Sequence, residues 1–362
     1  MTAAANGIWR ALATLTPGAP GRFLTVIGDQ SGWVLDHEAR QVGALLRRQG
    51  VSVREARTPW PNQPAFFAAR EQALHQLERW QAMRVPVCFP YYHGYPGDGD
   101  RAFDATYAQL VRGHRHVARI QVTHARMHEA VLASGIDASK VHRIAIGVDT
   151  TAFTLPGPGV RETVRARLGV PASAVVVGSF QKDGNGWGEG LEPKRVKAPE
   201  ILVAAIVELH ARIPELWVLL SGPARGYVMR ALSEAGVPFV YAGAGEIDVP
   251  SLYHAIDVYL VSSRQEGGPK AVLESMASGI PIVSTRVGQA TAVIEDGLTG
   301  FLVDIDDAEA LAEAGRRALD ATWQRTAIPA ARAVAERHDY ANQTPQWLAF
   351  FDGLVARDGA YR

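Results

Sequence analysis

The chain has little of what would place it outside the ordinary globular proteins. It holds one cysteine, Cys88, in 362 residues, which excludes a disulfide framework and any multi-cysteine metal site. Its most apolar stretches, such as residues 201–209, are too short and interrupted to span a bilayer. The first residues lack a long apolar core behind a basic start, so we expect no secretory signal. These absences favour a soluble protein of the reducing cytoplasm.

The formal net charge is zero, but the charges are unevenly divided along the chain. Residues 1–150 hold 17 Lys and Arg against 12 Asp and Glu, and the remainder carries the opposite excess. The basic half is compatible with a weak peripheral contact to an anionic membrane surface, and a chance distribution of solvated charge is the alternative. No run of Lys and Arg interleaves with aromatic residues, so nucleic acid is not favoured as a partner.

Short apolar runs bounded by Gly and Pro alternate with amphipathic stretches throughout. These runs cover residues 23–28, 85–93, 118–124, 141–147, 174–180, 216–222, 238–243, 257–263 and 280–285. Such runs are typical of buried parallel strands, and their alternation with helices predicts the α/β class. The Pro- and Gly-rich stretch 154–160 predicts a boundary between two Rossmann-like domains, 1–155 and 156–340. Ligands of open α/β sheets bind outside the carboxyl ends of the strands, so two such domains facing each other would enclose a deep cleft.

One stretch, SSRQEGGPKAVLESMASGIP at 262–281, joins a strand to a helix through a Gly-Gly-Pro turn. Pro269 suits the first helical position and Gly279 the residue after the helix, which predicts a helix over 269–278. The unpaired N–H groups of its first turn, approached closely through Gly267 and Gly268, form an anion site that favours phosphate.

Two glutamates, Glu266 and Glu274, stand eight positions apart around that turn. On one helix, eight residues span about 12 Å, whereas paired glycosidase carboxylates lie about 5 to 9.5 Å apart. A long ligand with a sugar, a diphosphate and a ribose fits this spacing better than a hydrolytic pair. Exposed glutamates favoured by the helix dipole are the plainer alternative.

The whole stretch resembles the E-x7-E motif of retaining GT-B glycosyltransferases, especially family 4. Residues 297–303, GLTGFLV, and 140–153, KVHRIAIGVDTTAF, are similar to further segments of that family. The resemblance implies that Glu274 binds the ribose and Glu266 contacts the donor sugar. It also implies that the helix start, from Gly267 and Gly268 through Pro269 to Lys270, holds the donor.

The resemblance further implies two cations that neutralise the diphosphate, a Lys before a helix and an Arg soon after a strand. Lys197 matches the Lys. In place of the Arg, this chain has a Gly-rich insertion within residues 178–200, in which Lys182 is the best replacement and Lys194 and Arg195 compete with it. The insertion could fold over the donor as a lid.

In the first half, His93 follows an apolar strand, where the family often has a His near the donor sugar. A satisfied structural histidine is the alternative. Gly32 is a weaker match to a first-domain glycine that approaches the phosphates or the acceptor. Residues 342–356 are apolar enough to need burial, and the resemblance implies that the segment 340–362 packs back on the first domain.

The sequence therefore predicts a retaining hexosyltransferase-type enzyme that moves a sugar from a nucleotide-diphosphate donor to a hydroxyl acceptor. No metal and no other cofactor are expected. A sugar-nucleotide epimerase or a phosphorylase of the same fold is one alternative. A non-catalytic two-lobed sugar-binding protein is another, and it is disfavoured because such proteins are usually exported.

Overall fold

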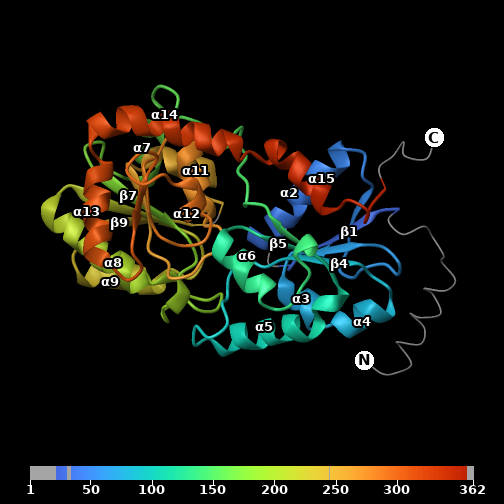
Figure 1. Ribbon diagram of the computed structural model, residues 1–362. Helices are drawn as coiled ribbons and strands as arrows, with labels where there is room; N and C mark the ends of the chain where they lie inside the picture. The colour runs from blue at the N-terminus through green and yellow to red at the C-terminus, as the bar shows by residue number, and fades with distance from the viewer. Residues whose placement is uncertain (1–21, 31–33, 244, 357–362) are drawn as a thin grey trace. The chain divides into compact units, whose positions relative to one another are not determined.

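The computed structural model describes residues 22–30, 34–243 and 245–356. They form two compact units. The first unit comprises the described residues up to Ile146 and those from Tyr340 onward, and the second comprises the described residues between Gly147 and Asp339. Each unit is built around its own parallel six-stranded sheet (Figure 1). The predicted α/β class is confirmed.

The first unit's sheet has the strand order β2-β1-β3-β4-β5-β6, and every pairing is parallel. Its strands are β1 (Leu24–Ile27), β2 (Val53–Glu55), β3 (Ala65–Phe67), β4 (Val87–Pro90), β5 (Val117–Val122) and β6 (Val141–Arg143). Its helices are α2 (Val34–Arg48), α3 (Arg70–Leu74), α4 (Leu77–Ala82), α5 (Arg101–Gly113), α6 (Ala125–Leu132) and α15 (Thr344–Phe350). The described residues of this unit also form 3₁₀ turns at His114–His116, Ala138–Lys140 and Tyr340–Gln343.

The last helix of the chain is part of the first unit's core. Trp347, Phe350 and Phe351 of the α15 region are buried, and all three pack edge-on against Phe66 of β3. The Tyr340 hydroxyl also donates a hydrogen bond of 2.6 Å to Glu38 of α2. The apolar pattern at 342–356 therefore serves one buried face of this sheet.

The second unit's sheet has the strand order β12-β11-β10-β7-β8-β9. Its strands are β7 (Val175–Phe180), β8 (Leu216–Ser221), β9 (Phe239–Ala242), β10 (Val258–Val261), β11 (Ile282–Thr285) and β12 (Phe301–Val303). Its helices are α7 (Val160–Leu168), α8 (Pro199–Arg212), α9 (Gly226–Glu234), α10 (Val249–Ala255), α11 (Lys270–Ala277), α12 (Ala290–Val293), α13 (Ala308–Ala318) and α14 (Ala321–Arg337), with a 3₁₀ turn at Arg195–Lys197.

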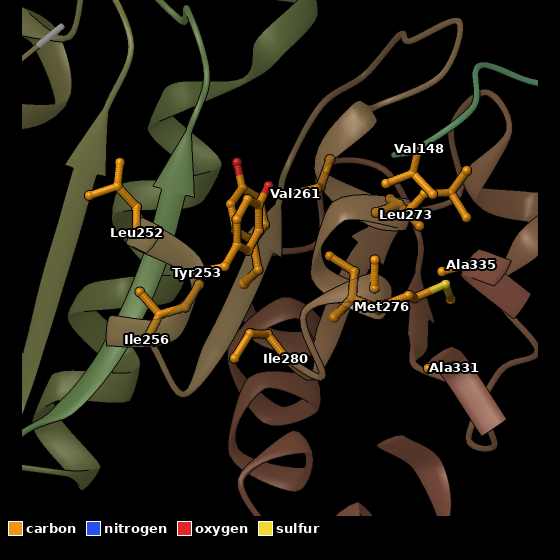
Figure 2. Packing of buried hydrophobic residues seen from close by; sticks show 14 of the residues in the cluster. Val148, Leu252, Tyr253, Ile256, Val261, Leu273, Met276, Ile280, Ala331 and Ala335 are labelled. Carbon is orange, nitrogen blue, oxygen red and sulfur yellow. The ribbon is translucent and has the colours of Figure 1, made fainter. Parts of the chain in front are cut away.

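Helices cover both faces of this sheet. Since successive strand residues point to opposite faces, both sets of side chains are buried. In β10, Val258 and Leu260 pack with α8, α9 and α13, whereas Tyr259 and Val261 pack with α10, α11 and α14. Figure 2 shows the second of these clusters, in which Met276 of α11 lies near Ala331 and Ala335 of α14. This two-sided burial explains why the strands read as unbroken apolar runs.

The boundary between the units differs from the one that the Pro- and Gly-rich stretch predicted. The structure places residues 147–155 in the second unit rather than the first. There Val148 forms a parallel bridge with Asp339, and Arg332 of α14 donates to the carbonyls of Thr150 at 3.2 Å and Phe153 at 2.7 Å. A long-range main-chain anchor, which composition does not reveal, decides the boundary.

Within the described part of the chain, every helix is too short or too polar to cross a membrane.

Candidate functional site

The candidate residues of the second unit gather where its strand order reverses. β7 lies next to both β8 and β10, so the connections leaving β7 and β10 run in opposite directions along the sheet. Such a switch point, at the carboxyl ends of the strands, is where open α/β sheets bind ligands. The loop after β7 carries Lys182 and Lys197, and the loop after β10 carries Glu266.

Lys197 and Glu266 meet as an ion pair between the Lys197 Nζ and the Glu266 Oε1. The Ser263 hydroxyl donates a further hydrogen bond of 2.8 Å to the same carboxylate oxygen. Both charged side chains are largely buried, with exposed fractions of 20% for Lys197 and 13% for Glu266. The Ser262 hydroxyl also holds the Lys197 carbonyl at 3.1 Å. The structure therefore brings together two of the predicted site residues from loops 69 positions apart.

Glu274 lies on the second turn of α11 and is half-buried. Its Oε2 accepts a hydrogen bond of 2.8 Å from the hydroxyl of Tyr253 on α10. The Tyr253 ring is fully buried. Burial, with the nearby Glu274 carboxylate, raises the pKa of the Tyr253 phenol well above its usual value, so it is protonated and donates.

The Gly-Gly-Pro turn is held closely against the segment after β11. The Gln289 amide donates a hydrogen bond of 3.0 Å to the Gly267 carbonyl. A Cβ on Gly288, whose φ is +50°, would lie 2.5 Å from that carbonyl oxygen, so glycine is needed at this contact. The turn therefore has one packed conformation.

Helix α11 begins at Lys270, one residue later than predicted, because Pro269 lies at the N-cap with ψ 106°. Proline has no side-chain acceptor, so among the described residues α11 starts without a side-chain cap. Gly279 has φ +71° after the helix, as predicted for a helix-ending glycine. The uncapped start of α11 is the kind of terminus that binds anions.

The Gly-rich insertion forms a closed hairpin anchored within the second unit. Gly184 pairs with Pro193 in an antiparallel bridge, and the Lys194 amide donates to the Asp183 carbonyl at 2.7 Å. Added Cβ atoms on Gly184 and Gly190 would lie 2.5 and 2.2 Å from the Ala224 carbonyl oxygen. The glycines of this insertion therefore allow close main-chain packing against the turn before α9.

A buried ion pair lies at the base of this hairpin. Arg225 and Asp183 have side-chain exposures of 1% and 0%, and their charged atoms are 3.1 Å apart. Arg225 also donates to the carbonyls of Ser179 at 2.8 Å and Gln181 at 2.9 Å. Neither carboxylate oxygen of Asp183 accepts a hydrogen bond within the described chain. Burial consequently raises the pKa of Asp183, while the Arg225 and Lys197 charges lower it less.

Lys182 lies at the start of this insertion, beside the tip of the hairpin. Its Nζ is 4.1 Å from the ring centroid of Trp187, an indole with 61% of its surface exposed. Burial lowers the pKa of Lys182. The structure does not show Lys182 paired with the Lys197–Glu266 ion pair, so its predicted contact with a diphosphate stays a prediction. Lys194 caps the 3₁₀ turn before α8 and Arg195 begins it, and the Arg195 carbonyl accepts from Arg264 at 2.9 Å.

His93 belongs to the first unit, after β4. Its carbonyl accepts a hydrogen bond from the buried Arg70 guanidinium, and its ring meets the Phe103 ring edge-on at 5.3 Å. These contacts fit a structural histidine as well as a ligand-contacting one. Gly32 lies outside the described residues.

Sequence reasoning missed the residues that orient the candidate groups, namely Ser263, Tyr253, Asp183 and Arg225. Tyr253 and Glu274 are 21 positions apart on different helices, and no spacing rule links them. Ser263 lay inside the quoted motif, three residues before Glu266. This short spacing in the sequence was the one signal that could have predicted the hydrogen bond from Ser263 to Glu266.

Comparison with known proteins now gives this geometry a context. Residues 189–321 match the family model described as Glycosyl transferases group 1. The D-inositol 3-phosphate glycosyltransferase of Corynebacterium urealyticum is 30% identical over 242 residues, covering 62% of this chain and 54% of the relative. That of Saccharomonospora viridis is 31% identical over 231 residues, covering 60% and 51%. The chain spans about half the length of these curated relatives.

Solved structures resemble the chain over most of its length. The Anabaena protein Alr3699/HepE in complex with UDP-glucose has a TM-score of 0.74 at 19% identity, with 91% of this chain and 100% of that chain covered. Sucrose-phosphate synthase from Thermosynechococcus elongatus has a TM-score of 0.67 at 19% identity, covering 90% and 96%. The chain has the GT-B fold of glycosyltransferases, with two Rossmann-like domains. Its second unit is the part that matches the group 1 family.

Proposed function

We propose that the protein is a glycosyltransferase that uses a nucleotide-diphosphate sugar as donor and a hydroxyl group as acceptor. One observation carries the proposal. In the unit that matches the group 1 family, the Lys197–Glu266 ion pair and Glu274 flank the uncapped start of α11 at the switch point of the sheet. A cation, an anion-binding helix start and two carboxylates suit the diphosphate and the hydroxyl groups of one donor.

Charge on the departing diphosphate is what this site can stabilise. As the bond between the anomeric carbon and the phosphate oxygen breaks, negative charge grows on the leaving group. Lys197, fixed by Glu266 and Ser262, is a preorganised cation for that charge. The start of α11 adds a positive dipole end. In this proposal Glu266, which is held by Ser263, accepts hydrogen bonds from sugar hydroxyls, and Glu274 accepts them from the ribose.

We further propose that transfer retains the anomeric configuration. The acceptor oxygen would attack on the face from which the diphosphate departs, and the leaving phosphate would take the acceptor proton. In this scheme no side chain of the enzyme forms a bond to the sugar. Nuclear magnetic resonance of the newly formed linkage tests it, because an inverted anomeric centre would contradict front-face attack.

Metal independence belongs to the same proposal. Among the residues that the structure describes, no group of three or more His, Cys, Asp or Glu side chains is placed to hold a metal ion. Lys197 and the start of α11 offer positive charge where a metal-dependent transferase would use a cation. Activity should therefore survive EDTA, and a loss that manganese restores would contradict this part of the proposal.

The donor and acceptor to test first follow from the comparisons. The Anabaena structure contains UDP-glucose, so UDP and UDP-glucose are the first probes. The curated relatives are named D-inositol 3-phosphate glycosyltransferases, so inositol 3-phosphate is the first acceptor. Other bases and polyols follow in the same assay.

The experiment combines calorimetric titration with nucleoside diphosphates and mass spectrometry of products formed with and without acceptor. A transferred sugar that requires the acceptor supports the proposal. A changed sugar nucleotide formed without acceptor would indicate an epimerase instead. Sugar phosphate released with inorganic phosphate as acceptor would indicate a phosphorylase. Binding of free sugars without turnover of any donor would indicate a non-catalytic sugar-binding protein.

A weak peripheral contact with anionic membranes remains part of the proposed function. The first unit has a hollow of about 740 Å³ beside α5, whose lining includes Arg79, Arg112, two histidines and one acidic residue, Glu78. It contains none of the candidate site residues. Sedimentation with vesicles of neutral and anionic lipids tests the contact, which should require anionic lipid and weaken with salt.

A further inference from the structure

Tyr253 is a buried hydroxyl whose polar partner is a candidate ligand-binding carboxylate. Its oxygen donates to Glu274 at 2.8 Å, and the residue itself has no exposed surface. Figure 2 shows its ring within the apolar cluster, with Ile256 and Val261 nearby. A phenol placed in such a cluster usually has a specific partner, because an unpaired buried hydroxyl is costly.

The ring that carries this hydroxyl is fixed from several sides. Phe153 and Phe180 meet it edge-on at centroid distances of 5.6 and 5.1 Å. Tyr259 of β10 stacks on it at 5.7 Å with an interplanar angle of 22°. The Tyr253 oxygen therefore has one position, set by rings from β7, β10 and the segment before α7.

We propose that Tyr253 is a positioning residue that fixes the orientation of the Glu274 carboxylate toward the ribose hydroxyls of a bound nucleotide. This inference rests on the proposed function, since it assigns how that same site recognises its ligand. Glu274 is half-buried on α11, and a glutamate has three side-chain torsions. A fixed donor to one oxygen removes most of that freedom before the ligand arrives, which is how preorganisation raises affinity.

The neighbouring tyrosine provides a matched control. Tyr259 is buried in the same ring cluster, but its hydroxyl oxygen accepts a hydrogen bond of 2.7 Å from the Phe180 amide. Tyr253→Phe and Tyr259→Phe each delete one oxygen atom and leave the ring in place. The first removes a contact to Glu274, and the second a contact to the main chain.

The experiment measures the affinity of wild type and both variants for UDP and for 2′,3′-dideoxyuridine diphosphate, with thermal unfolding of each protein alongside. Tyr253→Phe should weaken UDP binding about tenfold, the effect of losing one hydrogen bond to a charged group. It should leave binding of the dideoxy analogue unchanged, because that ligand has no ribose hydroxyls for Glu274. Tyr259→Phe should leave both affinities unchanged.

The positioning role would be wrong if Tyr253→Phe lowered the affinity for both ligands equally, or if the two variants had equal effects. Tyr253 would then have only a packing role. The proposed function would then stand, because wild type still binds UDP. If wild type binds no nucleoside diphosphate, the proposed function itself fails. Glu274→Gln gives an independent reading, since Tyr253→Phe should add little to its effect if the hydroxyl acts through Glu274.

Discussion

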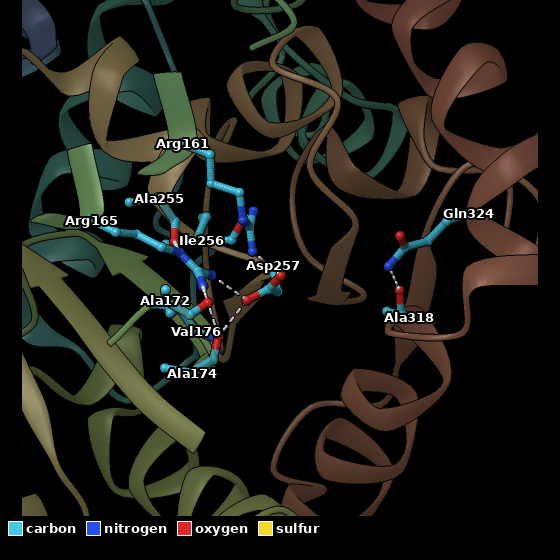
Figure 3. Close-up of polar contacts among 10 residues, drawn as sticks. All are labelled: Arg161, Arg165, Ala172, Ala174, Val176, Ala255, Ile256, Asp257, Ala318 and Gln324. Carbon is cyan, nitrogen blue, oxygen red and sulfur yellow. Dashed lines mark hydrogen bonds and ion pairs between the residues drawn. The ribbon is translucent and has the colours of Figure 1, made fainter. Parts of the chain in front are cut away.

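In the second unit's sheet, charges are held differently where the strands begin, which we call the amino edge, and where they end, which we call the carboxyl edge. At the amino edge, Asp257 precedes β10 and pairs with Arg161 and Arg165 (Figure 3). Its Oδ2 accepts from the Arg165 guanidinium at 2.6 Å and from the Val176 amide at 2.7 Å. Arg165 also donates to the carbonyls of Ala255 at 2.9 Å and Ala174 at 2.8 Å. Every charge in this group joins one secondary-structure element to another.

At the carboxyl edge, Arg225 is likewise held by main-chain carbonyls, but its partner Asp183 and the lysines of the β7 loop differ from the amino-edge group. Asp183 is fully buried beside Arg225, but its two carboxylate oxygens accept no hydrogen bond within the described residues. Lys182 lies over the exposed ring of Trp187, and Lys197 contacts Glu266. Main-chain groups saturate Arg165 and Asp257 at the amino edge, and at the carboxyl edge they do so for Arg225. Charges at the proposed site keep interactions that a ligand can join or replace, which is costly for stability and useful for binding.

The largest effect on stability is expected at the amino edge. Asp257→Asn leaves Arg165, with 4% of its side chain exposed, without its anionic partner. Breaking such a buried pair costs about 3 to 5 kcal/mol of unfolding free energy. Chemical denaturation measures the loss, and Glu313→Gln, which breaks an exposed pair with Arg212, should leave the midpoint nearly unchanged. The affinity for UDP should stay unchanged in both variants. A large loss of UDP affinity in Asp257→Asn would contradict the distinction between the two edges.

Lys197→Ala should show the opposite behaviour at the carboxyl edge. Removing one preorganised group that stabilises the leaving diphosphate costs about 10² to 10³ in turnover. Steady-state kinetics measure it, with Lys140→Ala as the control, because Lys140 belongs to the first unit and its Nζ donates to the Arg115 carbonyl at 3.4 Å. Normal turnover in Lys197→Ala, or an equal loss in both variants, would remove Lys197 from the proposed mechanism.

Glu266→Ala separates sugar contact from nucleotide contact. Its carboxylate is held by Ser263 and Lys197, on the other side of the Gly-Gly-Pro turn from Glu274. Loss of hydrogen bonds from a charged group to the sugar should cost about 1.5 to 3 kcal/mol in the affinity for UDP-glucose and in transfer. The affinity for UDP alone should be retained. A variant that loses UDP and UDP-glucose affinity equally would show that Glu266 holds the nucleotide instead.

The smallest effect concerns Asp248, the N-cap of α10, the helix that also carries Tyr253. Its carboxylate accepts hydrogen bonds from the Ser251 amide at 3.1 Å and hydroxyl at 2.8 Å at the start of α10. Partial burial acts to raise its pKa, but these hydrogen bonds outweigh it and hold the pKa below the usual 3.8. A lowered pKa means that the cap stabilises the fold above pH 3.8 and is lost as pH falls through the folded-state value.

Asp248→Ala should therefore cost about 1 kcal/mol at neutral pH. The difference from wild type should shrink as the pH falls below 3.8. Thermal unfolding across that range measures the difference. A cost that stays constant with pH would show that the carboxylate charge is not what stabilises α10.

Much of this second unit could be predicted from its sequence because the relevant signals are local. The run 257–263 became β10, and Pro269 and Gly279 bounded α11 within one residue. The glutamate pair was found from its spacing around a turn. In the first unit, the three-residue strand β3, Ala65–Phe67, carries too short a pattern to detect.

The parts that sequence could not give depend on long-range packing. Asp183 and Arg225 lie on a hairpin and a helix start brought together by the β7–β8 pairing. Tyr253 reaches Glu274 because α10 and α11 cover the same face of the sheet. No residue pattern near either partner predicts these contacts.

The position of the domain boundary was mispredicted for the same reason. Val148 forms a bridge with Asp339, which lies at the other end of the second unit's sequence.

Calorimetric titration with UDP is the measurement that tests the central claim most directly, namely that the carboxyl edge of this sheet binds the nucleotide of a sugar donor. Wild type and Asp257→Asn should bind UDP with equal affinity. Glu274→Ala should bind it more weakly by about 1.5 to 3 kcal/mol, or about 10- to 150-fold. Wild-type affinity in Glu274→Ala, or a loss in Asp257→Asn as large as that in Glu274→Ala, would contradict the account.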